Sequence, residues 1–352
     1  DEFFHSDLIK AHKAGSAVVG TNLGAMSPGT AYVLLHHYMG DVDGAVGAWG
    51  FPRGGMGAVS GALAGAVQEH GGEIRTNAGV DQIMVKNGKV TGVRLENGEE
   101  ITSDRVVSNV DAKKTFLGMM DPEDAGEKVV KAAKRYKSRG SSGKLNIALN
   151  GIPEFTALPK GSELIKGDFH IVDNMEAYER GYDEWKDGKW STHPYVDLLI
   201  PTLTDPTMAP PGKHFMTCFV QYCPSRVEGK DWTPELLKQF SDNVIDNIAK
   251  YSPNLKDLIE HVEIRPGQVI DNEIGLTEGN IFQGELSLNQ LMFNRPFHGC
   301  AQYRGPVNGL YLSGSTAHPG GGVMGAPGAN SAREILIDMN ISTTVPEDEG
   351  DD

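Results

Sequence analysis

Short runs rich in Val, Ile and Leu alternate with polar turn residues between positions 80 and 109 of this 352-residue chain. The runs 80–86 and 90–96 have the length and composition of β-strands. Asn87-Gly88 separates them and Asn97-Gly98 follows the second, and both dipeptides favour tight hairpin turns. Because shorter strand-like runs continue to residue 109, this segment predicts an antiparallel β-meander.

Helical spacing of apolar residues marks a second kind of segment, clearest between Pro234 and Tyr251. Residues 54–72 predict a helix of small residues, and 1–53 predict two helical pieces and a loop, the second helix starting near Pro28. Further strands are expected at 73–76, 144–149, 195–200, 215–222 and 310–312. The pattern therefore predicts a mixed α/β (α+β) chain.

The run from Leu310 to Leu336 carries the strongest chemical signal. An apolar strand enters Ser-Gly-Ser, and three consecutive glycines are expected to open a helix. Glycines let a ligand touch the backbone, and a helix N-terminus offers free N–H groups and partial positive charge. Such an end suits phosphate or a reduced flavin. The candidate cofactor residues are Gly314, Ser315, His318, Pro319, Gly320, Gly321, Gly322, Val323, Met324 and Gly325.

The C-terminal run resembles the flavin-binding motif of the phytoene desaturase-like branch of the amine oxidase superfamily. Other motifs resemble the same family in the same order: Gly47-Ala48-Trp49-Gly50, Gly54-Gly55-Met56-Gly57-Ala58, Gly279-Asn280-Ile281-Phe282-Gln283-Gly284, Ser287-Leu288-Asn289-Gln290-Leu291 and Arg295-Pro296. The resemblance covers nearly the whole chain apart from its acidic tail.

The resemblance implies FAD as cofactor and an incomplete Rossmann-like FAD domain beside a substrate domain built on an antiparallel sheet. Residues 1–53 would be a helical part of the substrate domain, 54–111 an FAD-domain portion with the meander, 112–300 the substrate domain, 301–340 the C-terminal flavin-binding segment, and 341–352 a disordered acidic tail. It also implies that the backbone at Val80 touches the adenine, although Val80 alone is equally a strand residue.

The family's N-terminal Gly-x-Gly-x-x-Gly turn is not found where it is expected, because the chain starts at Asp1 without that unit. Gly320, Gly322 and Gly325 match the spacing, but too little chain follows them to complete a βαβ unit. We expect a fragment of a longer flavoprotein whose N-terminal segment is a partner of this chain. The alternative is a relative that lost half of its cofactor site.

An aromatic and basic cluster precedes the glycine-rich helix, in Trp49, Phe51 and Arg53 followed by Gly54 and Gly55. If these residues lie near the flavin, they would shape a pocket for a small apolar or amphipathic substrate. The alternative is a packed loop with a surface arginine. For His318, the alternatives are a residue that lines the flavin and one held in a turn before Pro319.

The net charge and the cysteine content limit the kinds of partner and the cellular compartment that we expect for this chain. The net charge of −15, without a basic stripe, argues against nucleic acid. Cys218, Cys223 and Cys300 are too few for a disulfide framework, which indicates a reducing compartment: the cytoplasm or, in a eukaryote, the mitochondrial matrix. They also lack companion ligands, so no metal site is expected. A homo-oligomer is compatible with this composition.

The motifs that would indicate other enzymes are missing from the sequence. There is no Gly-x-Ser-x-Gly elbow, no Cys-x-x-Cys pair, and no carboxylate pair that stands out. Hydride transfer between the substrate and a flavin fits, because the cofactor then carries the difficult step. The rival hypothesis is a cofactor-free binding or scaffold protein that keeps the fold. Catalytic residues and the substrate cannot be assigned from the sequence.

Overall fold

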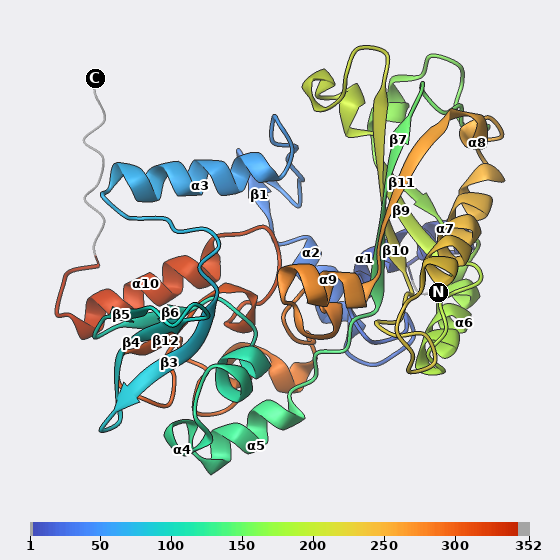
Figure 1. Ribbon diagram of the computed structural model, residues 1–352. Helices are drawn as coiled ribbons and strands as arrows, with labels where there is room; N and C mark the ends of the chain where they lie inside the picture. The colour runs from blue at the N-terminus through green and yellow to red at the C-terminus, as the bar shows by residue number, and fades with distance from the viewer. Residues whose placement is uncertain (1–2, 344–352) are drawn as a thin grey trace. The chain divides into compact units, whose positions relative to one another are not determined.

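The computed structural model describes residues 3–343 and confirms a mixed fold of helices and largely antiparallel sheets (Figure 1). The chain forms two compact units, and each combines two separated stretches. Unit 1 holds the residues up to Arg75 together with Ser138–Ile281. Unit 2 holds Thr76–Lys137 and the residues from Phe282 onward. The domain boundaries expected from the sequence stay a prediction, and tail residues 344–352 lie outside the described residues.

A five-stranded antiparallel sheet organises unit 1, with the strand order β11-β7-β10-β9-β8. The strands predicted near 144–149, 195–200 and 215–222 are confirmed within this sheet. The strands are β7 (Ser142–Leu149), β8 (Phe169–Ile171), β9 (Tyr195–Leu199), β10 (His214–Gln221) and β11 (Ile259–Arg265).

One face of this sheet is apolar and packs under helix α7 (Pro234–Ala249). Alternate residues of the strands, such as Ile147, Leu198 and Met216, are fully buried there, as the period of two in a strand requires. On α7, Phe240 and Val244 are buried four residues apart, as helical spacing predicts. The helix begins as its sequence indicates, with Pro234 in its first turn and the Thr233 side chain as N-cap.

The opposite face of the sheet is more polar and aromatic. Tyr178 and Trp185 of α6 (Met175–Lys186) pack there with Tyr195 and with Ala11 of α1 (Asp7–Val18). The remaining principal elements of unit 1 are α2 (Thr30–His37), β1 (Asp41–Val42), β2 (Ala45–Val46), α3 (Gly57–Glu69), α8 (Leu255–Leu258) and α9 (Gly267–Ile274).

Unit 2 contains the predicted meander, which is confirmed as the antiparallel strands β3 (Val80–Lys86), β4 (Lys89–Leu95) and β5 (Glu100–Thr102). Asn87 and Gly88 both have positive φ, at 54° and 71°, as the hairpin turn requires. Strand β6 (Val106–Ser108) pairs in parallel with β12 (Leu310–Leu312). The other elements are a short π-helix at Lys114–Gly118, α4 (Pro122–Ala125), α5 (Glu127–Arg135) and α10 (Ala326–Asp338).

Two expected elements differ in the structure. Residues 73–76 do not form a strand, because among the described residues no neighbouring strand offers them a hydrogen-bonded ladder. The C-terminal helix was expected to open at the three glycines, but α10 begins at Ala326. The glycines form a loop instead, in which Gly320 and Gly322 have φ of 112° and 139°, values that a helix excludes.

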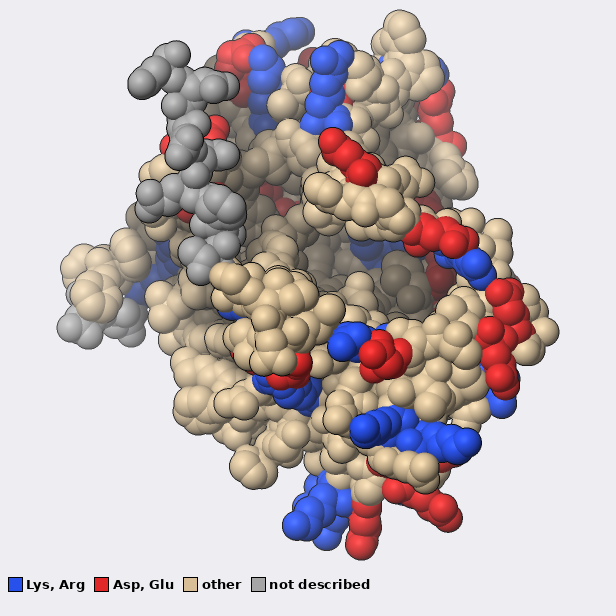
Figure 2. Space-filling view, turned by 90° about the vertical axis from the view of Figure 1, so that its left-hand side faces the viewer, with Lys and Arg blue, Asp and Glu red and all other residues tan. Residues whose placement is uncertain are grey.

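None of the described helices combines the length and apolar character needed to cross a bilayer. The face of the molecule seen in Figure 2 carries acidic and basic side chains interspersed with each other.

Candidate functional site

The predicted flavin segment is the loop from β12 to α10, and its first fixed point is Gly314. This residue has a φ of 72°, and a Cβ added to it would lie 2.0 Å from Oδ1 of Asn109. Only glycine therefore fits beside the residue that follows β6. Ser315 and Thr316 complete a short 3-10 turn, and Gln283 accepts a hydrogen bond from the Thr316 backbone N–H at 3.1 Å.

The three consecutive glycines have two different roles. A Cβ on Gly321 would lie 2.3 Å from Cδ1 of Phe282, so this buried glycine allows the loop to pack on the segment after residue 281. Gly322 is exposed and has a φ of 139°. Its backbone therefore adopts a conformation that side chains disfavour while it faces open space. Of these two glycines, only Gly322 has backbone that a ligand can reach.

The N-terminus of α10 is open to the surroundings. Space is free within 4 Å around an ideal Cβ at both Gly325 and Gly328, and Val323 is 77% exposed. Met324 between them is half-buried. The first turn of this 13-residue helix contains Pro327, which has no N–H, so Ala326 and Gly328 carry its N–H groups beside the open Gly325 and Gly328. A helix end without bulky side chains in front of it can approach the flat, electron-rich edge of a flavin ring closely.

His318 and Pro319 are half-buried and joined by a cis peptide bond. The His318 carbonyl accepts a hydrogen bond from Oη of Tyr303 at 2.9 Å, and Asn330 of α10 donates to the same hydroxyl at 2.9 Å. The backbone before the glycines is therefore tied to the helix that follows them.

Arg295 is a structural residue that the sequence revealed only as part of an Arg-Pro motif. Its side chain is completely buried and donates six hydrogen bonds to backbone carbonyls. Two of them reach Ser315, at 2.9 and 2.6 Å. The others reach Phe282, Gly284, Glu285 and Gln290. One guanidinium therefore holds the flavin segment against residues 282–290.

The remaining predicted site residues are placed in both units. Val80 begins β3, is 37% exposed and pairs with Leu95. Trp49 and Phe51 are 66% and 53% exposed in unit 1. Arg53 is exposed beside them.

The two glycines after Arg53 form a left-handed turn, with φ of 84° at Gly54 and 81° at Gly55. The Gly54 N–H donates to Oδ2 of Asp205 at 2.6 Å, which fixes the turn. The structure thus keeps the flavin candidates together in unit 2 and the substrate-pocket candidates together in unit 1. The functional role of both groups stays a prediction.

The cysteine interpretation agrees with the structure, which buries all three thiols. Burial raises the pKa of the Cys300 thiol to about 12, and it raises the pKa values of Cys218 and Cys223 as well. Such thiols are poor nucleophiles.

No carboxylate pair stands out in the sequence, but the fold brings two carboxylates together in unit 1. Asp168 and Asp197 converge on His170, whose Nε2 lies 3.1 Å from Oδ2 of Asp168 and 3.7 Å from Oδ2 of Asp197. Burial and contact with Asp168 raise the pKa of Asp197 to about 7. Burial is the largest single influence on Asp168 and His170 and disfavours charge on both, but their mutual hydrogen bond and the surrounding hydrogen bonds and charges together outweigh it, lowering the pKa of Asp168 and raising that of His170.

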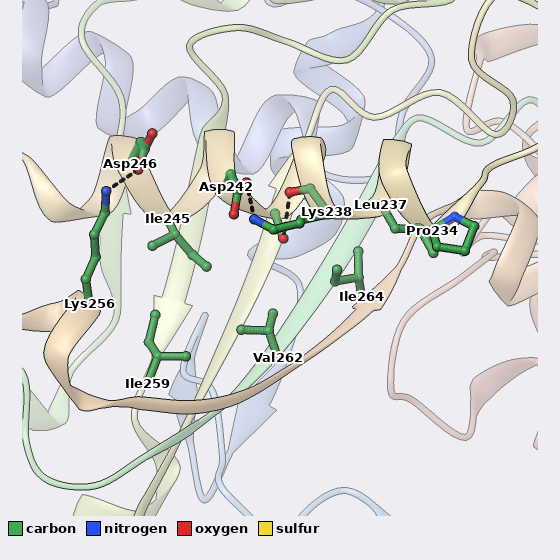
Figure 3. A pocket seen from close by; sticks show the side chains of 11 residues that line it. Pro234, Leu237, Lys238, Asp242, Ile245, Asp246, Lys256, Ile259, Val262 and Ile264 are labelled. Carbon is green, nitrogen blue, oxygen red and sulfur yellow. Dashed lines mark hydrogen bonds and ion pairs between the residues drawn. The ribbon is translucent and has the colours of Figure 1, made fainter.

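A groove of about 790 Å³ lies between α7 and the edge strand β11 (Figure 3). Aliphatic side chains of Ile245, Val262 and Ile264 line it. Ion pairs of 2.6 Å, Lys238–Asp242 and Lys256–Asp246, lie along its rim. None of the predicted site residues lines this groove.

Comparison with known proteins supports the sequence motifs. Residues 1–171 match the family of flavin containing amine oxidoreductases. The chain is 38% identical over 351 residues to pyridine nucleotide-disulfide oxidoreductase domain-containing protein 2 of Rattus norvegicus, covering 96% of this chain and 60% of that protein. It is 27% identical over 335 residues to a phytoene desaturase (lycopene-forming) of Pseudescherichia vulneris, covering 94% of this chain and 63% of the relative.

A solved oxidoreductase structure from Methanosarcina mazei has a TM-score of 0.55 to this chain at 18% identity. The matched region covers 92% of this chain and 64% of that structure. At 18% identity this similarity shows a common fold and nothing about activity. The chain spans about 60% of the length of the first curated relative. The predicted resemblance is confirmed: the first half of the chain is similar to the flavin containing amine oxidoreductases, and nearly all of it is similar to the phytoene desaturase-like proteins.

Proposed function

We propose that this chain is the flavin-end and substrate-domain portion of an FAD-dependent oxidoreductase of the phytoene desaturase-like type. The observation that carries the proposal is the exposed glycine loop at 322–325 in front of the open N-terminus of α10. Similarity to flavin containing amine oxidoreductases supports a flavin as the ligand of this surface.

The residues of this loop prearrange a binding surface. Arg295 fixes the Ser315 carbonyl, and Gly321 packs on Phe282, so the loop keeps its shape without a ligand. The α10 N-terminus would stabilise negative charge on the pyrimidine end of the cofactor by about 1 kcal/mol. FAD, when bound, supplies the acceptor or donor of a hydride.

Unit 1 would provide the substrate side. Its antiparallel sheet and the exposed Trp49 and Phe51 suit a small apolar or amphipathic molecule. Desaturation would transfer a hydride from substrate to flavin, saturation would transfer one from reduced flavin to substrate, and isomerisation would leave no net transfer. The proposed reaction class is hydride transfer between substrate and flavin, and an assay with each type of substrate would determine the direction of transfer.

A further segment of the same protein would complete the cofactor site. Helix α3 has no buried residue, and its Leu63 and Val67 are 65% and 47% exposed. An apolar helix face of this kind is typical of a helix that packs on a sheet. We propose that an N-terminal dinucleotide-binding segment covers α3. We propose separately that the backbone at Val80 contacts the adenine.

The test is the absorbance spectrum of the purified full-length protein. A flavin spectrum released as FAD by denaturation is expected, whereas the isolated 352-residue chain should bind FAD weakly, because it lacks the turn that would hold the pyrophosphate. Calorimetry with FAD measures the second part. A colourless full-length protein that does not take up FAD would instead favour the cofactor-free scaffold. Micromolar or tighter FAD binding by the isolated chain would contradict the proposal that an N-terminal segment completes the cofactor site.

A further inference from the structure

The cluster of Asp168, His170 and Asp197 is built by strand register. In the antiparallel pair β8–β9, His170 lies directly opposite Asp197. Tyr195 and Asp197 lie two residues apart in β9, so period-two alternation directs both to the face that His170 occupies. Asp168 lies directly before β8, and its carboxylate reaches Nε2 of His170. The intervening Val196 and the neighbouring Leu198 belong to the apolar core on the other face. This polar cluster therefore depends on the pairing of two strands, and it belongs to unit 1, whereas the proposed flavin segment belongs to unit 2.

The ligand atoms lie close enough together to share one metal ion. One imidazole nitrogen and two carboxylate oxygens lie within 4.8 Å of one another. Metal–ligand bonds of 2.0–2.2 Å place tetrahedral neighbours roughly 3.3–3.6 Å apart. The distances from His170 Nε2 to the two carboxylates, 3.1 and 3.7 Å, bracket this range. A cation could therefore be held with small side-chain adjustments.

The imidazole is fixed before any ion arrives. The ring of His170 lies between that of His12, with centroids 4.6 Å apart, and that of Tyr195, 5.3 Å away. Oη of Tyr195 also donates to Oδ2 of Asp197 at 3.4 Å, which orients that carboxylate. Groups that orient ligands from the outer shell are characteristic of metal sites. The side chain of Asp168 is 45% exposed, which leaves solvent access to the cluster.

We propose that Asp168, His170 and Asp197 form a binding site for a divalent first-row transition metal ion, with Zn²⁺ as its representative. Mixed imidazole and carboxylate ligands suit Zn²⁺ and disfavour the all-oxygen cations Mg²⁺ and Ca²⁺. Water would complete the coordination through the exposed side of Asp168. The ion would join the three-residue edge strand β8 to β9 and neutralise two carboxylates that otherwise repel each other. The competing arrangement is a protonated His170 between the two aspartates, with no metal.

Zinc binding tests the proposal directly. The full-length protein is stripped with chelator and titrated with Zn²⁺ by calorimetry, and Co²⁺ substitution reports the ligand set by visible absorbance. The variants are His170→Phe, which keeps a ring between His12 and Tyr195, and the near-isosteric Asp197→Asn and Asp168→Asn. His261→Gln, at an exposed position on β11, is the matched control.

About one equivalent of Zn²⁺ is expected in the stripped protein and in His261→Gln, with affinity at least tenfold lower in each cluster variant. Zn²⁺ should also raise the Tm of the stripped protein but not that of the variants. Circular dichroism checks that the variants fold, and the exposed Asp168→Asn keeps the test valid if His170→Phe does not. Failure to bind Zn²⁺, or equal affinity in folded Asp168→Asn and native protein, would overturn the proposal in favour of the metal-free arrangement. Flavin content is a separate measurement, so this result does not depend on the proposed function.

Discussion

Replacing Arg295 with Met would test whether one buried side chain holds the candidate flavin loop. Met has a similar length and fills the apolar part of the space, but it donates no hydrogen bond. Five backbone carbonyls, of Phe282, Gly284, Glu285, Gln290 and Ser315, would lose the donor they share. The perturbation thus removes six hydrogen bonds at once while leaving the backbone sequence otherwise intact.

The expected loss follows from the hydrogen bonds removed, because some of the carbonyls keep a second donor; Glu285, for example, still accepts from Nε2 of Gln290. Six hydrogen bonds at about 1 kcal/mol each give about 6 kcal/mol. Removing the guanidinium also ends the cost of burying a charge, which offsets part of this loss. We therefore expect the free energy of unfolding of unit 2 to fall by about 3–5 kcal/mol, a large part of the stability of an ordinary domain. Arg295→Lys should lose less, because it keeps the charge but has only three donors.

The assay should distinguish the two units. All four tryptophans, Trp49, Trp185, Trp190 and Trp232, belong to unit 1, so their fluorescence during urea unfolding reports unit 1. Hydrogen exchange of peptides from 76–137 and 282–343 reports unit 2. Arg304→Met is the matched control, because Arg304 forms half-exposed ion pairs with Glu334 and Asp338 and should contribute no more than about 1 kcal/mol. A change below about 1 kcal/mol in unit 2 for Arg295→Met would refute the reasoning.

Two further outcomes follow from the loop and from the thiols. In the full-length protein, Gly322→Val should lower the flavin content or the reduction potential of the flavin, because a Cβ at φ 139° moves the backbone away from the ligand. The control Cys218→Ala should leave both quantities unchanged. If folded Gly322→Val protein keeps normal flavin content and potential, the glycine run serves packing and does not bind the flavin. Gly325→Ala has space around it and an ordinary φ of −76°, so it should fold normally and affect only ligand approach, which flavin content measures. Alkylation of the native chain at pH 8 should label none of the three thiols, and alkylation in urea should label all of them. Burial raises the pKa values of the thiols, so their contribution to the free energy of unfolding is complete below pH 9. That contribution is lost as the pH rises toward the pKa of about 12 for Cys300. Rapid labelling of any native thiol would contradict this burial.

Local signals account for what the sequence predicted correctly. Asn87-Gly88 specifies its turn by backbone preference alone, and the spacing of Phe240 and Val244 specifies the buried face of α7. These features need no knowledge of distant residues. The glycines at 320–322 were predicted to open a helix and form a loop instead, because glycine permits positive φ as readily as helical φ and its presence alone does not decide between them.

The missed features depend on distant partners. Residues 73–76 have strand character, but a strand also needs a neighbour, which the described chain does not offer them. Asp168 and Asp197 are brought together only by the register of β8 against β9. The carbonyls that surround Arg295 lie in separate loops, so the sequence revealed the Arg-Pro motif without its partners.

The parallel pairing of β6 with β12 constrains the order of events during synthesis. Its two strands are separated by roughly 200 residues, and the whole of Ser138–Ile281 is made between them. The ribosome therefore releases the sheet of unit 1 while β6 still lacks its partner, and unit 2 closes only after Leu312 has emerged. A truncation before β12 would leave strand β6 without its partner, and an unpaired strand edge is a template for aggregation. The strand β12 thus completes the part of unit 2 that is translated roughly 200 residues earlier.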